Sequence, residues 1–203
     1  MSMSKQKRLV VGITGASGAL YAVRTLAVLL EKGFQVDLVV SDLGRRLLKE
    51  ELGDVTIDRL IDYLVSKYGP EIREGSLAVS GNKDVGARIA SGSNQCDAMV
   101  IVPCSMKTMA GVAHGLSRNL IERAADVMLK ERRKLIVVPR ETPMSIVQLR
   151  NMLLCAEAGV FVVPAMPAFY QGPNTLDDLA DFMAGKILSA LDIEHNLYQP
   201  WTG

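Results

Sequence analysis

The sequence predicts a doubly wound α/β fold, in which helices cover both faces of a mainly parallel sheet. Continuous runs of Val, Ile and Leu, such as residues 8–14 and 97–103, alternate with segments whose apolar residues recur at helical spacing. Strands that are apolar on both sides are typical of parallel sheets buried between helices. Hydrophobic residues make up 49% of the 203 residues, so we expect one Rossmann-like domain over residues 1–203.

Each run in turn predicts one element of that fold. The residues expected to form buried strands are 8–14, 35–41, 97–103, 134–139 and 160–163. The residues expected to form helices are 19–31, 43–52, 56–68, 106–113, 119–132, 145–158 and 175–191. Gly33 and Gly159 follow two of these helices and are typical stop signals. The polar stretch 69–93 predicts short strands and loops, and residues 192–203 are expected to form a tail.

Charge and composition argue against several classes of function. Lys and Arg number 23 against 22 Asp and Glu, and aromatic residues make up 5%, which argues against a broad nucleic-acid-binding face. The two histidines and three cysteines show no metal-ligand spacing, and no Cys-x-x-Cys pair occurs. The odd number of cysteines and the lack of an apolar span of about 20 residues lead us to expect a cytoplasmic protein without a membrane helix.

Ligands of doubly wound sheets bind where the strands end, so the strand-to-helix junctions are candidate sites. The first junction, GITGASG, carries Gly12, Gly15 and Gly18 at a spacing of three. Such a turn at the start of a helix offers free N–H groups to an anion, which favours a phosphate-binding turn over a plain tight turn. The dinucleotide fingerprint G-x-G-x-x-G is not matched.

A short-chain reductase is one alternative, because TGASG resembles the opening of that family and Tyr63 and Lys67 have its Y-x-x-x-K spacing. In those enzymes, however, the pair comes well beyond mid-chain, whereas here it directly follows the second βα unit. We interpret Tyr63 and Lys67 as part of an amphipathic helix that buries Leu60, Ile61 and Leu64.

Later junctions add hydroxyls and charges. PCSMKT, at the end of the third strand, places Ser105 and Thr108 where they can cap a helix, while Cys104 is more typical of a small buried residue than of a nucleophile. VVPRETP places Arg140 and Glu141 at a strand end, which suggests an anion clamp beside an acid/base. A structural ion pair is the alternative reading of these two residues.

Two further segments carry candidate residues. Arg123 and Lys130 are seven residues apart and are expected on one face of a helix, where a solvated charged helix is the alternative. The proline-rich segment 164–173 predicts a shaped loop that exposes the Tyr170 hydroxyl, and a surface turn with a packed aromatic ring is the alternative.

Five motifs in order resemble those of the UbiX-type flavin prenyltransferases, formerly labelled aromatic-acid decarboxylase subunits. The motifs are GITGASG, PCSMKT, NLIERAADVMLKERR, VPRETP and PAMPAFY, and the resemblance extends from about Lys7 to Leu191. It implies an enzyme that joins the dimethylallyl group of dimethylallyl phosphate to N5 and C6 of reduced FMN without a metal. The product, prenylated FMN, would serve a UbiD-type decarboxylase. The resemblance also implies a homo-oligomer, a dodecamer, with the site completed across a subunit interface.

Residue roles follow from the same resemblance. The residues implied to bind FMN are Gly15, Ala16, Ser17, Ser41, Ser105, Met106, Lys107, Thr108 and Arg123. The residues implied to surround the substrate phosphate are Lys130, Arg140, Glu141, Tyr170 and Lys186. The residues implied to act in catalysis are Ser17, Glu51, Lys130, Arg140 and Glu141. Within this set Glu141 is implied to transfer a proton and Ser17 to assist at N5, and Trp201 in the tail is implied to close over the site.

Other functions on the same fold stay open. Flavin-dependent cysteine decarboxylases carry an early catalytic His and a P-x-M-N-x-x-M-W motif, whereas the first histidine here is His114 and residues 164–170 read PAMPAFY. A flavin-binding, non-catalytic partner subunit of a decarboxylase would have no need for the cations and the acid of the predicted site. Direct decarboxylation by this chain finds no separate support in its residues.

Overall fold

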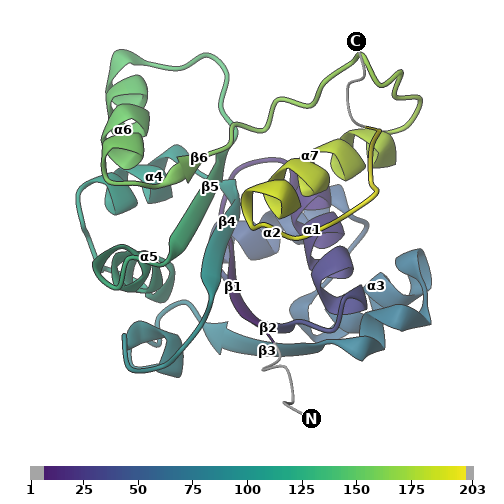
Figure 1. Ribbon diagram of the computed structural model, residues 1–203, viewed down its shortest axis with the longest axis horizontal. Coiled ribbons are helices and arrows are strands. Elements are labelled where there is room, and N and C mark those ends of the chain that lie inside the picture. The colour runs from purple at the N-terminus through teal and green to yellow at the C-terminus, as the bar shows by residue number, and fades with distance from the viewer. Residues whose placement is uncertain (1–6, 200–203) are drawn as a thin grey trace.

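The computed structural model describes residues 7–199, which form a six-stranded sheet with helices on both faces (Figure 1). The strands are all parallel and lie in the order β3-β2-β1-β4-β5-β6. Their bounds are β1 (Arg8–Ile13), β2 (Gln35–Val40), β3 (Ser76–Gly81), β4 (Ala98–Cys104), β5 (Lys134–Pro139) and β6 (Phe161–Val162). This order confirms the doubly wound, Rossmann-like fold that the sequence predicts.

Helices connect the strands and form the two outer layers. The α-helices of the described residues are α1 (Ala19–Glu31), α2 (Asp42–Glu51), α3 (Leu60–Tyr68), α4 (Met106–Ala113), α5 (Leu120–Lys130), α6 (Ile146–Glu157) and α7 (Leu176–Ala190). Short 3-10 turns are η1 (Ile57–Arg59), η2 (Pro70–Glu74) and η3 (Arg88–Ala90). Within residues 7–199, no helix combines the length and the hydropathy needed to traverse a lipid bilayer.

Alternate residues of the central strands point into two separate cores. On β1, Leu9 and Val11 face one side of the sheet and Val10 faces the other. The first core packs α1, α2, α3 and α7 against the sheet, and the second core packs α4, α5 and α6. The cysteines of the chain, all free and all buried in the second core, are Cys96, Cys104 and Cys155.

Strand β3 is the main difference from the sequence-based expectation, which has only short strands and loops in the stretch 69–93. β3 pairs in parallel with β2 along its whole length and forms one edge of the sheet. All six of its residues are exposed or half-buried. An edge strand of this kind has no continuous apolar run, so the hydrophobic pattern does not reveal it. The helix expected over residues 56–68 likewise begins as the turn η1 before α3.

Residues 191–199 follow α7 and form no helix or strand. Trp201 lies outside the described residues, so its closure over the site stays a prediction.

Candidate functional site

The carboxyl ends of β1 and β4 lie side by side at the centre of the sheet, where the strand order changes direction. In doubly wound sheets this switch point is the usual place for a ligand. The buried Thr14 joins the two ends, because its hydroxyl donates to the Pro103 carbonyl at 2.9 Å and accepts from the Ser105 N–H at 2.7 Å. The GITGASG and PCSMKT motifs are therefore held together by one side chain that the sequence analysis did not single out.

A distant carboxylate caps the N-terminus of α1. Gly18 adopts a φ of 121°, which suits glycine, and its turn supplies no side-chain cap of its own. Glu51, the last residue of α2, instead accepts from the Gly18 N–H at 2.9 Å and the Ala19 N–H at 2.8 Å. These two N–H groups are thus bonded within the protein, and the role of the turn toward FMN stays a prediction.

Arg140 brings the end of β5 to the same turn. Its Nε donates to the Ser17 carbonyl at 3.2 Å. Glu141 follows directly, and its carboxylate accepts from the Thr142 N–H at 3.1 Å. The structure thus gathers Ser17, Glu51 and Arg140 around the N-terminus of α1, with Glu141 next to Arg140 in the chain.

Tyr21 joins this cluster, although the sequence analysis did not predict it. Its ring is so close to Gly18 that a Cβ at that position would come within 2.8 Å of it. Burial raises the pKa of Tyr21, while the charge of Arg140 lowers this pKa and the charge of Glu51 raises it. The available signal in the sequence is its place in the first turn of the helix that follows GITGASG.

Three helix N-termini converge on a basic cavity of about 490 Å³. Ser41 caps α2, Ser105 caps α4 and Asn119 caps α5, each through its side-chain oxygen. The cations that line this cavity are Arg45, Lys83, Lys107 and Arg118. They outnumber the two carboxylates of the lining, Asp42 and Glu122, of which Glu122 pairs with Arg118 at 3.2 Å. Helix N-termini and basic side chains both favour anions, so this cavity can hold a phosphate.

Several residues predicted to bind FMN lie at this cavity or beside it. Lys107 lines it, and Ser41 lies between two lining residues, Val40 and Asp42. The Thr108 N–H donates to the Ser105 hydroxyl oxygen at 3.3 Å, so both hydroxyls lie on the first turn of α4. Sequence reasoning missed Arg45, Lys83 and Arg118, because they belong to no motif and are brought together only by the fold.

The remaining predicted residues of these two junctions are packed more deeply. Ala16 and Met106 are buried. Gly15 lies so close to α2 that a Cβ would come within 2.5 Å of the Leu43 Cβ. The first turn therefore lies directly on α2, and Gly15 is needed for this close approach.

Arg123 makes contacts within its own half of the molecule. It donates from Nε to the Ala90 carbonyl at 3.1 Å and pairs with Asp126 at 2.8 Å. These contacts fix its guanidinium between α5 and η3, and its role toward FMN stays a prediction.

Lys130 does not join the Arg140 cluster of the same chain. It ends α5 and pairs with Glu131 at 3.4 Å, four residues before β5 begins at Lys134. Arg140 follows the other end of β5, and a strand of six residues spans about 20 Å. Lys130 therefore lies near the amino ends of the strands and Arg140 at their carboxyl ends.

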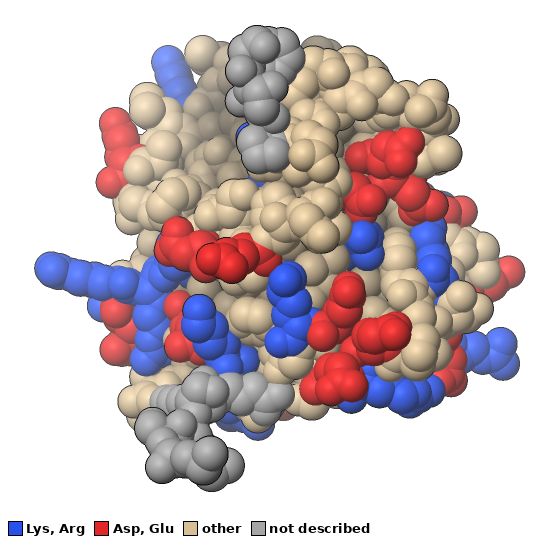
Figure 2. All heavy atoms as spheres, turned by 45° about the vertical axis from the view of Figure 1, so that its right-hand side comes forward, with Lys and Arg blue, Asp and Glu red and all other residues tan. Residues whose placement is uncertain are grey.

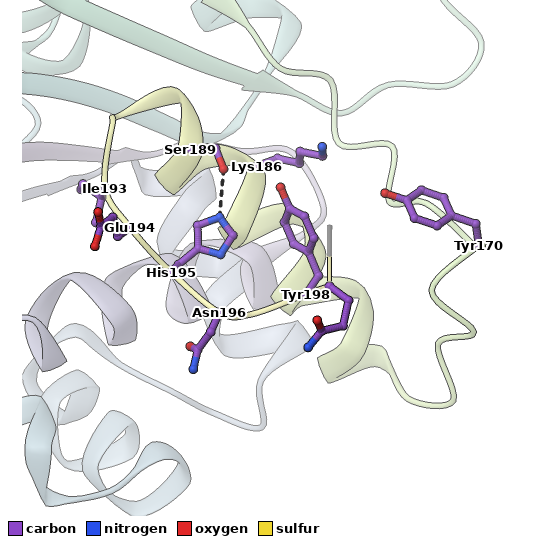
Figure 3. A pocket seen from close by; sticks show the side chains of 9 residues that line it. Tyr170, Lys186, Ser189, Ile193, Glu194, His195, Asn196 and Tyr198 are labelled. Carbon is purple, nitrogen blue, oxygen red and sulfur yellow. Dashed lines mark hydrogen bonds between the residues drawn. The ribbon is translucent and has the colours of Figure 1, made fainter. Parts of the chain in front are cut away.

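Tyr170 and Lys186 border a second cavity, of about 710 Å³, formed with α7 and the tail (Figure 3). Tyr170 is half exposed and comes from the loop between β6 and α7, as the sequence predicts. Figure 3 shows the Tyr170 and Lys186 side chains pointing toward the same space. The structure thus brings together two of the residues predicted to surround the substrate phosphate.

Two alternatives from the sequence lose support in this geometry. Cys104 is fully buried, and this burial raises its pKa, so it is a core residue rather than a nucleophile. Lys67 pairs with Asp177 of α7 at 2.7 Å and lies over the Tyr68 ring, so the Tyr63–Lys67 spacing belongs to helix packing.

Comparisons with known proteins show the family of the chain. Residues 1–194 match the flavoprotein family. The chain is 49% identical over 193 residues to a protein of Halalkalibacterium halodurans named flavin prenyltransferase UbiX, covering 94% of this chain and 91% of that one.

Two solved structures extend the likeness to three dimensions. AnUbiX (PadA1), solved in complex with FMN and dimethylallyl pyrophosphate, has 36% identity and a TM-score of 0.88 over 98% of this chain and 99% of its own. A dodecameric FMN-dependent UbiX-like decarboxylase from Escherichia coli O157:H7 has 37% identity and a TM-score of 0.84 over 97% of this chain and all (100%) of its own. The chain belongs to the flavoprotein family and, within it, to the UbiX-type flavin prenyltransferases.

Proposed function

We propose that this chain is a flavin prenyltransferase that joins the dimethylallyl group of dimethylallyl phosphate to N5 and C6 of reduced FMN and releases phosphate. The observation that carries this proposal is the near full-length match to AnUbiX, which was solved with FMN and dimethylallyl pyrophosphate together. FMN would supply an electron-rich ring that captures the allylic group.

The basic cavity is the proposed place of the FMN phosphate. The hydroxyls of Ser41, Ser105 and Thr108 lie at helix N-termini, and Lys107 adds a positive charge. A phosphate dianion fits this combination of helix dipoles, hydroxyls and cations. The other residues that we propose to contact FMN are Gly15, Ala16, Ser17, Met106 and Arg123.

Departure of the substrate phosphate needs positive charge where negative charge develops. Arg140 and Lys186 would supply it as cations, and the Tyr170 hydroxyl would donate a hydrogen bond. Ser17 would assist at N5, and Glu141, next to Arg140, would transfer the proton. Glu51 would act by fixing the first turn of α1, on which Ser17 depends.

Lys130 would act in the site of a neighbouring copy. Its distance from Arg140 along β5 is too long for one lysine side chain to bridge. In an oligomer, the end of α5 of a neighbouring subunit can come close to Arg140 instead. Exposed apolar residues on α6 and the loop before α7 offer a surface for such an assembly. They include Ile146, Val147, Leu153, Met166 and Phe169. Figure 2 shows that uncharged residues predominate at the top of the face that it draws.

Co-expression of two inactive variants tests this sharing. Lys130→Ala and Arg140→Ala chains, assembled at random in one oligomer, would recover about a quarter of the wild-type activity per site if the two residues come from different copies. No recovery in verified mixed oligomers would contradict the shared site. A homododecamer is the assembly that we propose, to be checked by light scattering.

The function itself is tested by anaerobic incubation of the protein with FMN, a reductant and dimethylallyl phosphate, followed by mass spectrometry of the extracted flavin. We expect a flavin heavier by one C5 unit, and none with Glu141→Gln. Unchanged FMN that still binds would contradict the proposal and favour a flavin-binding decarboxylase or a partner subunit.

We further propose that the product serves a UbiD-type decarboxylase and that the protein works in the cytoplasm. The three free, buried cysteines suit a reducing compartment.

A further inference from the structure

The tail after α7 folds back onto the molecule. Asp192 pairs with Lys134 at 2.6 Å, which ties the start of the tail to the start of β5. The Ile193 N–H donates to the Leu188 carbonyl at 2.9 Å. The tail is therefore fixed to α7 and to the sheet at its first residues.

His195 fixes the next part of the tail with both ring nitrogens. Nδ1 accepts from the Leu197 N–H at 3.3 Å, and Nε2 lies 2.9 Å from the Ser189 hydroxyl (Figure 3). In the tautomer whose Nδ1 accepts from Leu197, Nε2 carries the proton, and the ring also makes a hydrogen bond with the Gly185 backbone. His195 thus holds the tail in place on α7.

Gly185 lets the tail approach the helix this closely. A Cβ on Gly185 would come within 2.5 Å of the Tyr198 ring and 2.8 Å of the His195 ring. Both rings therefore lie directly on the backbone of α7, and a larger residue would push them away.

Tyr198, docked in this way, lies against Lys186. The Lys186 ammonium is 5.1 Å from the centroid of the Tyr198 ring and 5.3 Å from that of the Phe182 ring. The two rings are 5.0 Å apart, and Phe182 also meets Tyr170 edge-on at 6.1 Å. One aromatic cluster thus contacts both residues proposed to bind the substrate phosphate in this cavity.

We propose that Tyr198 is a positioning residue, whose ring holds the Lys186 ammonium ready for the phosphate of the allylic substrate. Lysine is a flexible point charge, and a ring face that attracts the ammonium reduces the freedom it loses when the phosphate binds. Without the ring, Lys186 keeps its charge and still reaches the bound phosphate, so its help to the departing phosphate is retained once the substrate is bound. The effect should therefore fall on KM for dimethylallyl phosphate rather than on kcat. This inference rests on the proposed function, in which Lys186 binds that phosphate.

The test compares steady-state KM and kcat of Tyr198 variants. We expect Tyr198→Leu to raise KM by about three- to tenfold with kcat nearly unchanged, and Tyr198→Phe, which keeps the ring, to restore KM. In a Lys186→Met background the effect of Tyr198→Leu should disappear. Asn196→Ala is the matched control, because Asn196 lines the same cavity but points away from Lys186 in Figure 3.

A second series covers the case in which Tyr198→Leu does not fold. Phenylalanine and its increasingly fluorinated analogues at position 198 keep the shape of the ring and weaken its attraction for a cation, so KM should rise with each fluorine. The inference would be overturned if KM did not depend on fluorination, or if Tyr198→Leu raised KM equally with and without Lys186. The prenyltransferase activity would stand in either case. A wild-type protein that forms no prenylated flavin would overturn both.

Discussion

Replacing Glu51 with alanine tests the cap on α1. The substitution removes two hydrogen bonds, which Glu51 accepts at 2.9 Å from Gly18 and at 2.8 Å from Ala19. The first bond is exposed and the second half-buried, so water replaces part of what is lost. Loss of an N-cap costs about 0.5–2 kcal/mol and loss of a charge at a helix N-terminus about 0.3–1 kcal/mol. We therefore expect Glu51→Ala to lower the free energy of unfolding by about 1–2 kcal/mol.

Glu51→Gln separates the hydrogen bonds from the charge. A single carboxylate oxygen, Oε2, accepts from both N–H groups, so the glutamine carbonyl oxygen can take its place. Only the charge is then lost, at a cost of about 0.5 kcal/mol. If Glu51 acts only through the cap, Glu51→Gln should also form prenylated FMN at close to the wild-type rate.

Urea unfolding at one fixed protein concentration is the assay, because the apparent stability of an oligomer depends on concentration. Glu50→Ala is the matched control: its carboxylate pairs at 2.7 Å with the exposed Arg46, an interaction worth about 0.5 kcal/mol. If Glu51→Ala is no more destabilising than Glu50→Ala, the reasoning about the cap is refuted.

Three further substitutions probe the surroundings of the site. Thr14→Val should lower the free energy of unfolding by about 1–3 kcal/mol, since it leaves the Ser105 N–H without its acceptor, and Thr14→Ser should lose less in the same urea titration. Gly44→Ala would place a Cβ within 2.7 Å of a carbonyl oxygen at the end of β1 and should cost about 1–3 kcal/mol, whereas Gly81→Ala, with nothing within 4 Å, is its control. Burial lowers the pKa of His195 below its usual 6.5, so the unfolded chain binds a proton first and the folded protein loses stability as pH falls through this range. The urea midpoint should therefore fall more between about pH 7.5 and 5.5 in the wild type than in His195→Gln, and equal falls would contradict this reasoning.

The buried strands and the order of the junction motifs could be predicted because each depends on local pattern. Continuous apolar runs mark β1, β4 and β5, since both faces of these strands are covered. β3 could not be predicted in the same way, because it lies at the edge and is not buried. The motifs GITGASG and PCSMKT could be placed at the switch point from their position after strands alone.

Contacts between distant segments were beyond sequence reasoning. Glu51 is 33 residues from Gly18, and nothing in the sequence links them. The separation of Lys130 and Arg140 is a different case. A helix that joins two parallel strands runs back along the sheet, toward the start of the next strand. The end of α5, with Lys130, must therefore lie near the start of β5, whereas Arg140 follows its end. The two residues were nevertheless grouped, because the resemblance assigns roles without saying which copy supplies each residue.

The cysteines are buried in the second core, so thiol labelling can follow local opening of that core. Burial raises the pKa of Cys155 to about 11 and raises that of Cys104 as well, so reactive thiolate is scarce until water enters. Since Cys104 and Cys155 are fully buried in the second core, a thiol reagent under native conditions would label these two thiols only when the half formed by α4, α5 and α6 opens. A labelling rate faster than global unfolding would show that this half opens while α1, α3 and α7 stay packed.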